Sequence, residues 1–190
     1  MMLNFAQMFK TTRSILVLGL LLSACSKNLE LPDFQQATHT IPDPNKKGTC
    51  LMFITPDCPL SHLYAQPYQQ LQAEFGHELE FLSVLPGSLY TEEEISHYVD
   101  SFRFNIPILQ DRQFELVEQT SASTTPQFIL MDNKGQILYS GAMDNWAISL
   151  ARKRIQPTRF YFKTAITQYI NHGVVTQENI PAIGCLIETR

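Results

Sequence analysis

"FITPDCPLSHLYAQPYQQL", residues 53–71, is the stretch that decides the fold. An apolar run, Thr49–Thr55, fits a buried strand, and Cys58 and Pro59 follow soon after it. Beyond Cys58, apolar side chains recur close to helical spacing. They are Leu60, Tyr64, Tyr68, Leu71 and Phe75. This spacing predicts a helix that ends at Gly76, so Cys58 is expected where a strand becomes a helix.

This position favours reactivity in a thiol. A cysteine reacts as its thiolate, and a free cysteine with a pKa of about 8.5 is mostly protonated at neutral pH. Unpaired backbone N–H groups and the helix dipole at a helix N-terminus stabilise the thiolate. Pro59 suits the first helical position, where a missing N–H costs nothing. Cys58 is therefore a candidate nucleophile, the alternative being an inert cysteine packed at a strand end.

The rest of the chain alternates between strand and helix patterns. Further strands are expected at Leu79–Leu85, at Pro126–Asp132 and, after a turn at 133–135, over 136–141, with a short extended piece near 106–111. Further helices are expected from the capping box Thr91–Glu94, over 112–119, and from about Thr158 to Asn171. This order predicts an α/β domain with a central mixed β-sheet flanked by helices.

Two further motifs carry a resemblance to a known family. "TTP", Thr124–Pro126, precedes a strand, as does the cis-proline that faces the reactive cysteine in the thioredoxin superfamily. "PAIGCLIE", Pro181–Glu188, together with "SGAMDN" and "QPTRFYFKTAI", resembles the redoxin branch that includes alkyl hydroperoxide reductase/thiol-specific antioxidant-like proteins. The resemblance covers roughly Cys50 to Ile187. It implies a thioredoxin-like fold, a cis Pro126 beside Cys58, and thiol–disulfide oxidoreductase or antioxidant activity without a cofactor.

A redox cysteine needs a partner thiol. In the familiar Cys-x-x-Cys motif the second cysteine lies three residues after the first, and here Ser61 occupies that position. Cys50 begins the strand before Cys58, and eight extended residues span roughly 26 Å, far beyond the roughly 7 Å between Cα atoms that a disulfide permits. Cys185 lies in a tail that can fold back, with Gly184 giving the backbone freedom before it. Cys185 is therefore the candidate resolving thiol, with an inert packed cysteine as the alternative.

A peroxide is a second candidate substrate. Peroxiredoxins resemble one another in Pro-x-x-x-Thr/Ser-x-x-Cys, and Thr55 occupies the threonine position relative to Cys58. Its hydroxyl could hydrogen-bond a peroxide. Leu51 stands where the proline of that pattern would be, so only half of the signature is present.

His62 indicates a different class of function, metal binding. It follows Cys58 by four residues, one helical turn away on the same face. Cysteine and histidine together suit copper, and the arrangement partly resembles copper chaperones of the same fold. The alternatives to an enzyme are therefore a copper-binding module that uses Cys58 and His62, or a catalytically silent binding domain.

The N-terminus has the pattern of a lipoprotein signal peptide over residues 1–24. Two basic residues precede a short apolar segment, and "LSAC" ends at Cys25, which resembles the bacterial lipobox and implies a lipid on Cys25. Residues 25–48 are expected to form a tether, and residues 49–190 the domain with its tail. Removing residues 1–24 lowers the number of Lys and Arg residues from 14 to 12, against 18 Asp and Glu. A lipid, rather than basic side chains, would therefore attach the protein to the membrane.

These features predict a protein of the bacterial cell envelope that faces the periplasm. Ser26, rather than an aspartate, follows Cys25, which favours the outer membrane. The acidic balance argues against a nucleic-acid partner. The expected partners are the membrane and a protein disulfide or thiol.

Overall fold

The computed structural model describes residues 28–189. The expected signal peptide and the lipid site at Cys25 lie outside these residues. Among residues 28–189 no helix is both long and apolar enough to span a bilayer.

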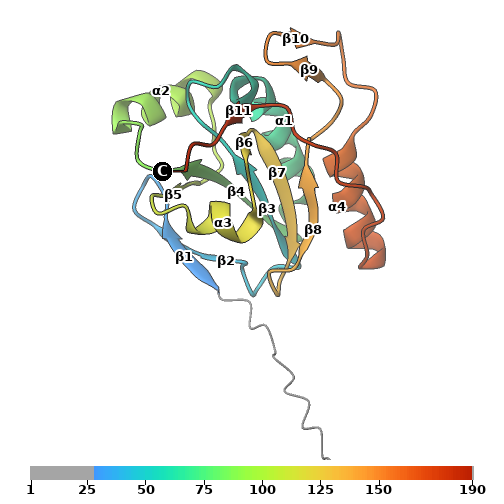
Figure 1. Ribbon diagram of the computed structural model, residues 1–190. Helices are drawn as coiled ribbons and strands as arrows, with labels where there is room; N and C mark the ends of the chain where they lie inside the picture. The colour runs from blue at the N-terminus through green and yellow to red at the C-terminus, as the bar shows by residue number, and fades with distance from the viewer. Residues whose placement is uncertain (1–27, 190) are drawn as a thin grey trace, which may run out of the picture.

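A five-stranded mixed sheet forms the centre of the molecule, in the order β5-β4-β3-β7-β8 (Figure 1). Its strands are β3 (Gly48–Phe53), β4 (Leu79–Pro86), β5 (Ile108–Asp111), β7 (Gln127–Asp132) and β8 (Ile137–Gly141). β3, β4 and β5 run parallel, whereas β7 pairs antiparallel with both β3 and β8. The expected mixed sheet is confirmed.

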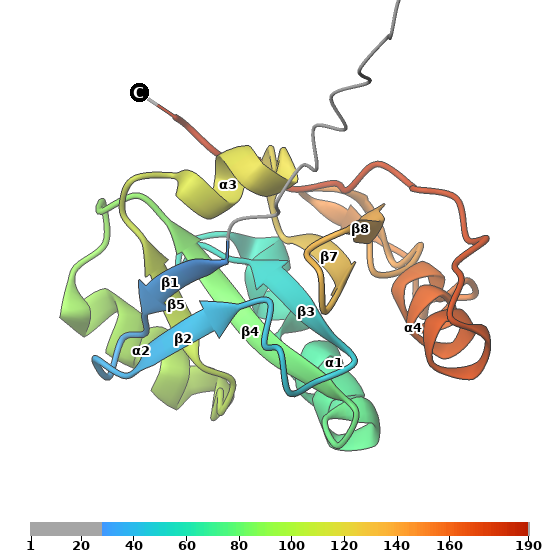
Figure 2. The same cartoon turned by 90° about the horizontal axis from the view of Figure 1, so that it is seen from below.

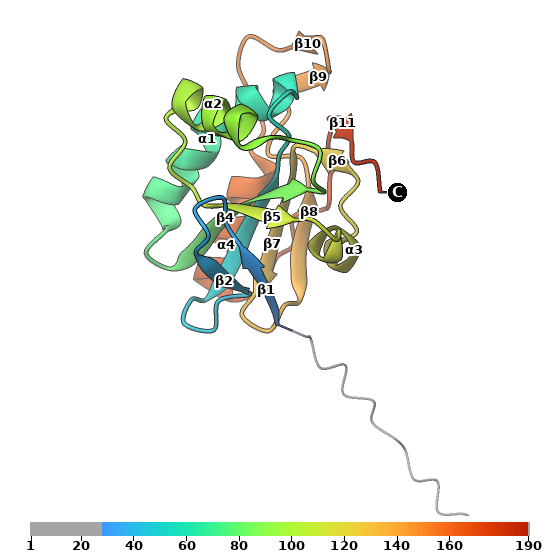
Figure 3. The same cartoon turned by 90° about the vertical axis from the view of Figure 1, so that its left-hand side faces the viewer.

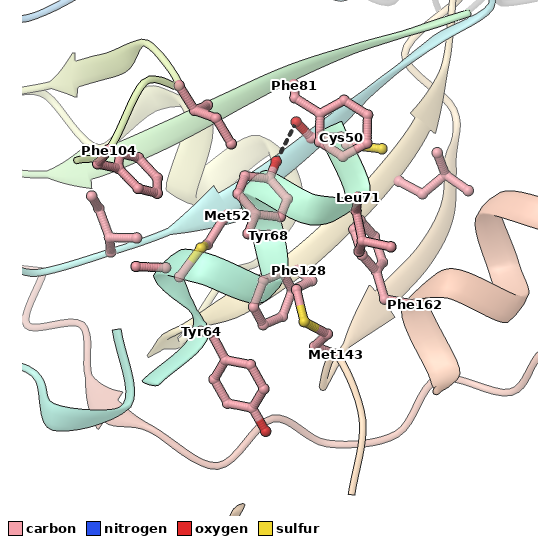
Figure 4. Packing of buried hydrophobic residues seen from close by; sticks show 14 of the residues in the cluster. Cys50, Met52, Tyr64, Tyr68, Leu71, Phe81, Phe104, Phe128, Met143 and Phe162 are labelled. Atoms are coloured by element: carbon pink, nitrogen blue, oxygen red, sulfur yellow. Dashed lines mark hydrogen bonds between the residues drawn. The ribbon is translucent and has the colours of Figure 1, made fainter. Parts of the chain in front are cut away.

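Helices cover both faces of this sheet (Figures 2 and 3). They are α1 (Pro59–Phe75), α2 (Glu92–Phe102), α3 (Glu115–Thr120) and α4 (Tyr161–His172). Alternate residues of β3 face opposite layers: Cys50 and Met52 join the core under α1 and α4, and Leu51 and Phe53 join the core under α3. Figure 4 shows Tyr68 of α1 inside the first layer, where its hydroxyl donates to the Cys50 carbonyl at 2.8 Å.

Residues 29–41 form a packed hairpin, so the expectation of a tether over 25–48 is wrong for this part. β1 (Leu29–Pro32) pairs antiparallel with β2 (Thr38–Ile41), and the Asp33 carboxylate accepts backbone N–H groups in the turn between them. Leu31 and Ile41 are buried in the same core layer as Leu51 and Phe53. Burial of these two side chains holds the hairpin against the sheet, and Pro32 ends a strand instead of breaking it.

Four short strands complete the chain. β9 (Ala147–Ser149) and β10 (Arg152–Lys153) form a small hairpin that projects from the body, and its basic residues are exposed (Figure 1). β6 (Thr124–Thr125) lies directly before Pro126, and β11 (Cys185–Leu186) pairs with it antiparallel. The tail therefore returns to the N-terminal end of α1, where Cys58 lies.

Candidate functional site

Cys58 is the N-cap residue of α1, as the sequence predicts, and its side chain is buried. Its thiol donates a hydrogen bond to the Thr125 carbonyl at 3.0 Å. The Thr125–Pro126 peptide bond is cis, which confirms the expectation for the "TTP" motif. The strand–helix junction and the segment before β7, far apart in sequence, thus meet at the Cys58 sulfur.

The C-terminal tail brings Cys185 to the same place. Cys185 lies opposite Thr125 in the β6–β11 pair, and the Ile187 N–H donates to the Ser123 carbonyl at 2.9 Å. The Cys185 thiol donates to the Cys58 sulfur, with the two sulfurs 2.8 Å apart. Both cysteines are free thiols in this structure. The two sulfurs are therefore in position to form a disulfide without any large movement.

Gly184 permits this approach. A Cβ atom built at residue 184 would lie 2.3 Å from the Thr125 carbonyl oxygen and 2.7 Å from its carbon. Both neighbours are backbone atoms, which cannot rotate away as a side chain can. The tail can pair with β6 only because residue 184 has no side chain, which is a different role from the backbone freedom expected from the sequence.

The surroundings of the two thiols shift their pKa values in opposite directions. Burial alone raises the pKa of Cys58, but hydrogen bonds from the Cys185 thiol and from backbone N–H groups at the start of α1 outweigh it and lower the pKa. Burial, and then the hydrogen bond to Cys58, raise the pKa of Cys185. Cys58 is therefore the more acidic thiol of the reduced pair.

Cys50 differs from both. It is completely buried in β3, and burial raises the pKa of its thiol well above the ordinary value. Cys50 is thus a small apolar core residue.

Thr55 lies beside the sulfur pair. Its hydroxyl shares a 3.0 Å hydrogen bond with the Thr125 hydroxyl, and its backbone N–H donates to the Ser61 hydroxyl at 3.3 Å. Ser61, which replaces the second cysteine of the familiar motif, is fully buried. Its hydroxyl thus ties the end of the β3 segment to the first turn of α1.

Asp57 and Tyr90 also belong to the site, although no sequence motif marks either residue. The Tyr90 hydroxyl donates to the Asp57 carboxylate at 2.5 Å, and burial, then this bond, raise the pKa of Tyr90. Tyr90 comes from the loop after β4, so only the tertiary structure brings it to Asp57. The sequence pattern around either residue gave no signal for this contact.

His62 is exposed on α1, and its side chain contacts neighbouring groups rather than either sulfur. The imidazole Nε2 contacts the Pro56 carbonyl, and the ring packs 4.9 Å from the centre of the Phe102 ring. Across residues 28–189, no cluster of three or more potential His, Cys, Asp or Glu metal ligands is assembled. The geometry thus joins Cys58 to Cys185, and it does not add to the case for copper.

Comparison with known proteins places the fold. No family model and no curated protein matches the chain. Among solved structures, a hypothetical protein from Sinorhizobium meliloti is 20% identical with a TM-score of 0.73, covering 86% of this chain and 92% of that one. The exposed lipoprotein thioredoxin of Streptococcus pneumoniae is 19% identical with a TM-score of 0.53, covering 60% of this chain and 87% of that one.

A third similar structure is a secreted disulfide oxidoreductase of Mycobacterium tuberculosis homologous to DsbE of E. coli. It is 17% identical with a TM-score of 0.50, covering 58% of this chain and 80% of that one. The fold of this chain is therefore thioredoxin-like, and its structural neighbours include thiol–disulfide oxidoreductases.

Proposed function

We propose that this protein is a thiol–disulfide oxidoreductase of the bacterial cell envelope that cycles between a Cys58/Cys185 dithiol and a Cys58–Cys185 disulfide. The observation that carries the proposal is the 2.8 Å distance between the two sulfurs, which the β6–β11 pairing maintains. The opposite pKa shifts support it, because they make Cys58 the more acidic and Cys185 the less acidic thiol of the pair.

The reaction needs two exchanges. With the tail displaced, the Cys58 thiolate attacks a partner disulfide, forms a mixed disulfide and releases one partner thiolate. The deprotonated Cys185 sulfur then attacks Cys58, forms the intramolecular disulfide and releases the second partner thiolate. The partner gains two electrons and this chain loses them. Cys185 takes the place of the missing second cysteine of the motif, and tethering in one chain favours the second step over attack by a free thiol.

The location and the range of substrates belong to the same proposal. A lipid on Cys25 would hold the protein on the periplasmic side of a membrane, with the outer membrane favoured, and a protein disulfide or thiol would be its partner. Thr55 lines the same hollow as Cys185, which supports a peroxide as the second class of substrate. Copper bound by Cys58 and His62 is the competing proposal.

Mass spectrometry of the oxidised protein after digestion without reductant tests the proposal. We expect a Cys58–Cys185 peptide pair in the wild-type chain. In Cys185→Ser, Cys58 should instead appear as an intermolecular adduct or a sulfenic acid. Cys50→Ala is the matched control and should leave the pair intact, because Cys50 is buried in the core. Oxidised wild-type protein in which both cysteines stay unlinked would contradict the proposal and favour the copper module or a silent binding domain.

A further inference from the structure

A hollow beside the sulfur pair exposes one of the two cysteines. It has a volume of about 230 Å³, and Asp57, Leu89, Tyr90, Cys185, Leu186 and Glu188 are among the residues that line it. Cys185 is partly exposed, whereas Cys58 is 1% exposed and lies beneath the tail. A molecule that approaches from solvent along this hollow therefore meets the Cys185 sulfur first.

We propose that in the oxidised protein an incoming partner thiolate attacks the sulfur of Cys185, and that Cys58 is the leaving group. This inference rests on the proposed Cys58–Cys185 disulfide and specifies how its reduction begins. Forming that disulfide brings together two sulfurs that are already 2.8 Å apart, so the tail and the hollow stay in place.

The chemistry of exchange favours the same direction. The partner thiol first loses its proton to solvent, and its thiolate forms a new S–S bond with Cys185. The Cys58–Cys185 bond breaks, and its electron pair leaves on Cys58. A sulfur whose thiolate is stabilised leaves faster. The hydrogen bonds at the start of α1 lower the pKa of Cys58, whereas burial raises that of Cys185.

The hollow also indicates the chemistry of the partner. Leu89 and Leu186 line it and present 79% and 78% of their surfaces to solvent. Asp57 and Glu188 line it, and none of the described lining residues is basic. A hollow lined by exposed leucines and two exposed acids fits a thiol carried on a segment of a partner protein with apolar and basic side chains next to its cysteine.

Trapping the first adduct tests this order of attack. The full-length chain with Cys25→Ser and Cys50→Ala is oxidised, reacted briefly with cysteamine, quenched with acid and maleimide, and digested. We expect cysteamine on Cys185 and maleimide on Cys58, in excess over the opposite pattern by about tenfold or more. Cysteamine on Cys58 in the earliest samples would overturn the inference but leave the proposed function intact. Failure to form the disulfide at all would overturn both.

Charge selectivity gives a second readout on the same protein. Cationic cysteamine should open the disulfide faster than anionic mercaptoethanesulfonate by about the few-fold effect expected of a partly exposed charge. Asp57→Asn should reduce this preference. Asp100→Asn, which removes an exposed acid on α2 away from the hollow, is the matched control and should not. Equal reduction of the preference by both variants would show that the net charge, not the hollow, selects the thiol, which contradicts the proposed entry route.

Discussion

At the scale of single residues, Cys58 and Cys185 carry the same side chain but ionise differently. The Cys185 thiol contributes most among the hydrogen bonds that lower the pKa of Cys58 against the opposing effect of burial. The reduced protein should therefore ionise at Cys58 before it ionises at Cys185 as the pH rises. The Cys185 thiol, whose own pKa is raised, therefore acts as a hydrogen-bond donor to Cys58.

Replacing the Cys185 donor tests this assignment. In a Cys25→Ser, Cys50→Ala background, Cys185→Ala should raise the pKa of Cys58, because a hydrogen bond to the thiolate is lost and burial remains. Cys185→Ser keeps a hydroxyl donor and should raise it less. Thiolate absorbance against pH measures both, with iodoacetamide rates as a check. An identical pKa in both variants and in the background protein would show that α1 alone sets the ionisation of Cys58.

Part of the site could be predicted at this scale. The strand–Cys58–Pro59 pattern placed the thiol at the start of α1, and "TTP" placed the cis Pro126 next to it. The first prediction used local backbone preferences, which a sequence records directly, whereas the second came from the resemblance to the thioredoxin superfamily. The pairing of Cys185 with Cys58 was one hypothesis among several, because contact between residues so far apart depends on the path of the tail over the whole domain.

At the scale of elements, the strands and helices with clear apolar periodicity were predicted close to their observed bounds, including the capping box at Thr91 and Glu94. The β1–β2 hairpin was missed because its prolines and polar residues resemble a linker. Its buried side chains Leu31 and Ile41, and the bridge between Asp33 and Leu109 of β5, show that it belongs to the domain. β11 was missed because a strand of two residues leaves no periodic pattern.

The β6–β11 pair depends on Gly184, which makes it testable by one substitution. Gly184→Ala places a Cβ 2.3 Å from the Thr125 carbonyl oxygen, so the tail must move away from β6. Loss of one or two backbone hydrogen bonds, each contributing about 1 kcal/mol, should increase the detached population by about tenfold. The Cys58 thiol, now uncovered, should react faster with a bulky maleimide, and the Cys58–Cys185 disulfide should form more slowly.

Gly173→Asn is the matched control for this variant. Gly173 ends α4 in a left-handed conformation that asparagine tolerates, and nothing lies within 4 Å of a Cβ placed there. Its maleimide rate should equal that of the wild type. If Gly184→Ala also keeps the wild-type rate, the tail does not control access to Cys58.

At the scale of the whole molecule, the hairpin changes where a lipid anchor would place the site. With residues 29–41 folded against the sheet, the chain between Cys25 and Leu29 can span at most about 14 Å. The described chain begins at one end of the molecule, and β6 and β11 lie towards the other (Figures 1 and 3). A protein held by a lipid on Cys25 should therefore sit close to the bilayer with its sulfur pair turned away from it.

Fluorescence quenching by headgroup-labelled lipid can measure this orientation. Asn45→Cys places a label in the exposed loop between β2 and β3, and Leu150→Cys places one between β9 and β10, at the opposite end (Figure 1). Both changes are made in a chain that keeps Cys25 but carries alanine at its other three cysteines. In vesicles, we expect strong quenching at position 45 and little at position 150, because quenching falls steeply with distance. A Cys25→Ser version should show no quenching at either position. Stronger quenching at position 150 would contradict this orientation. It would show that the sulfur pair faces the membrane, where its partners would be proteins embedded in the bilayer.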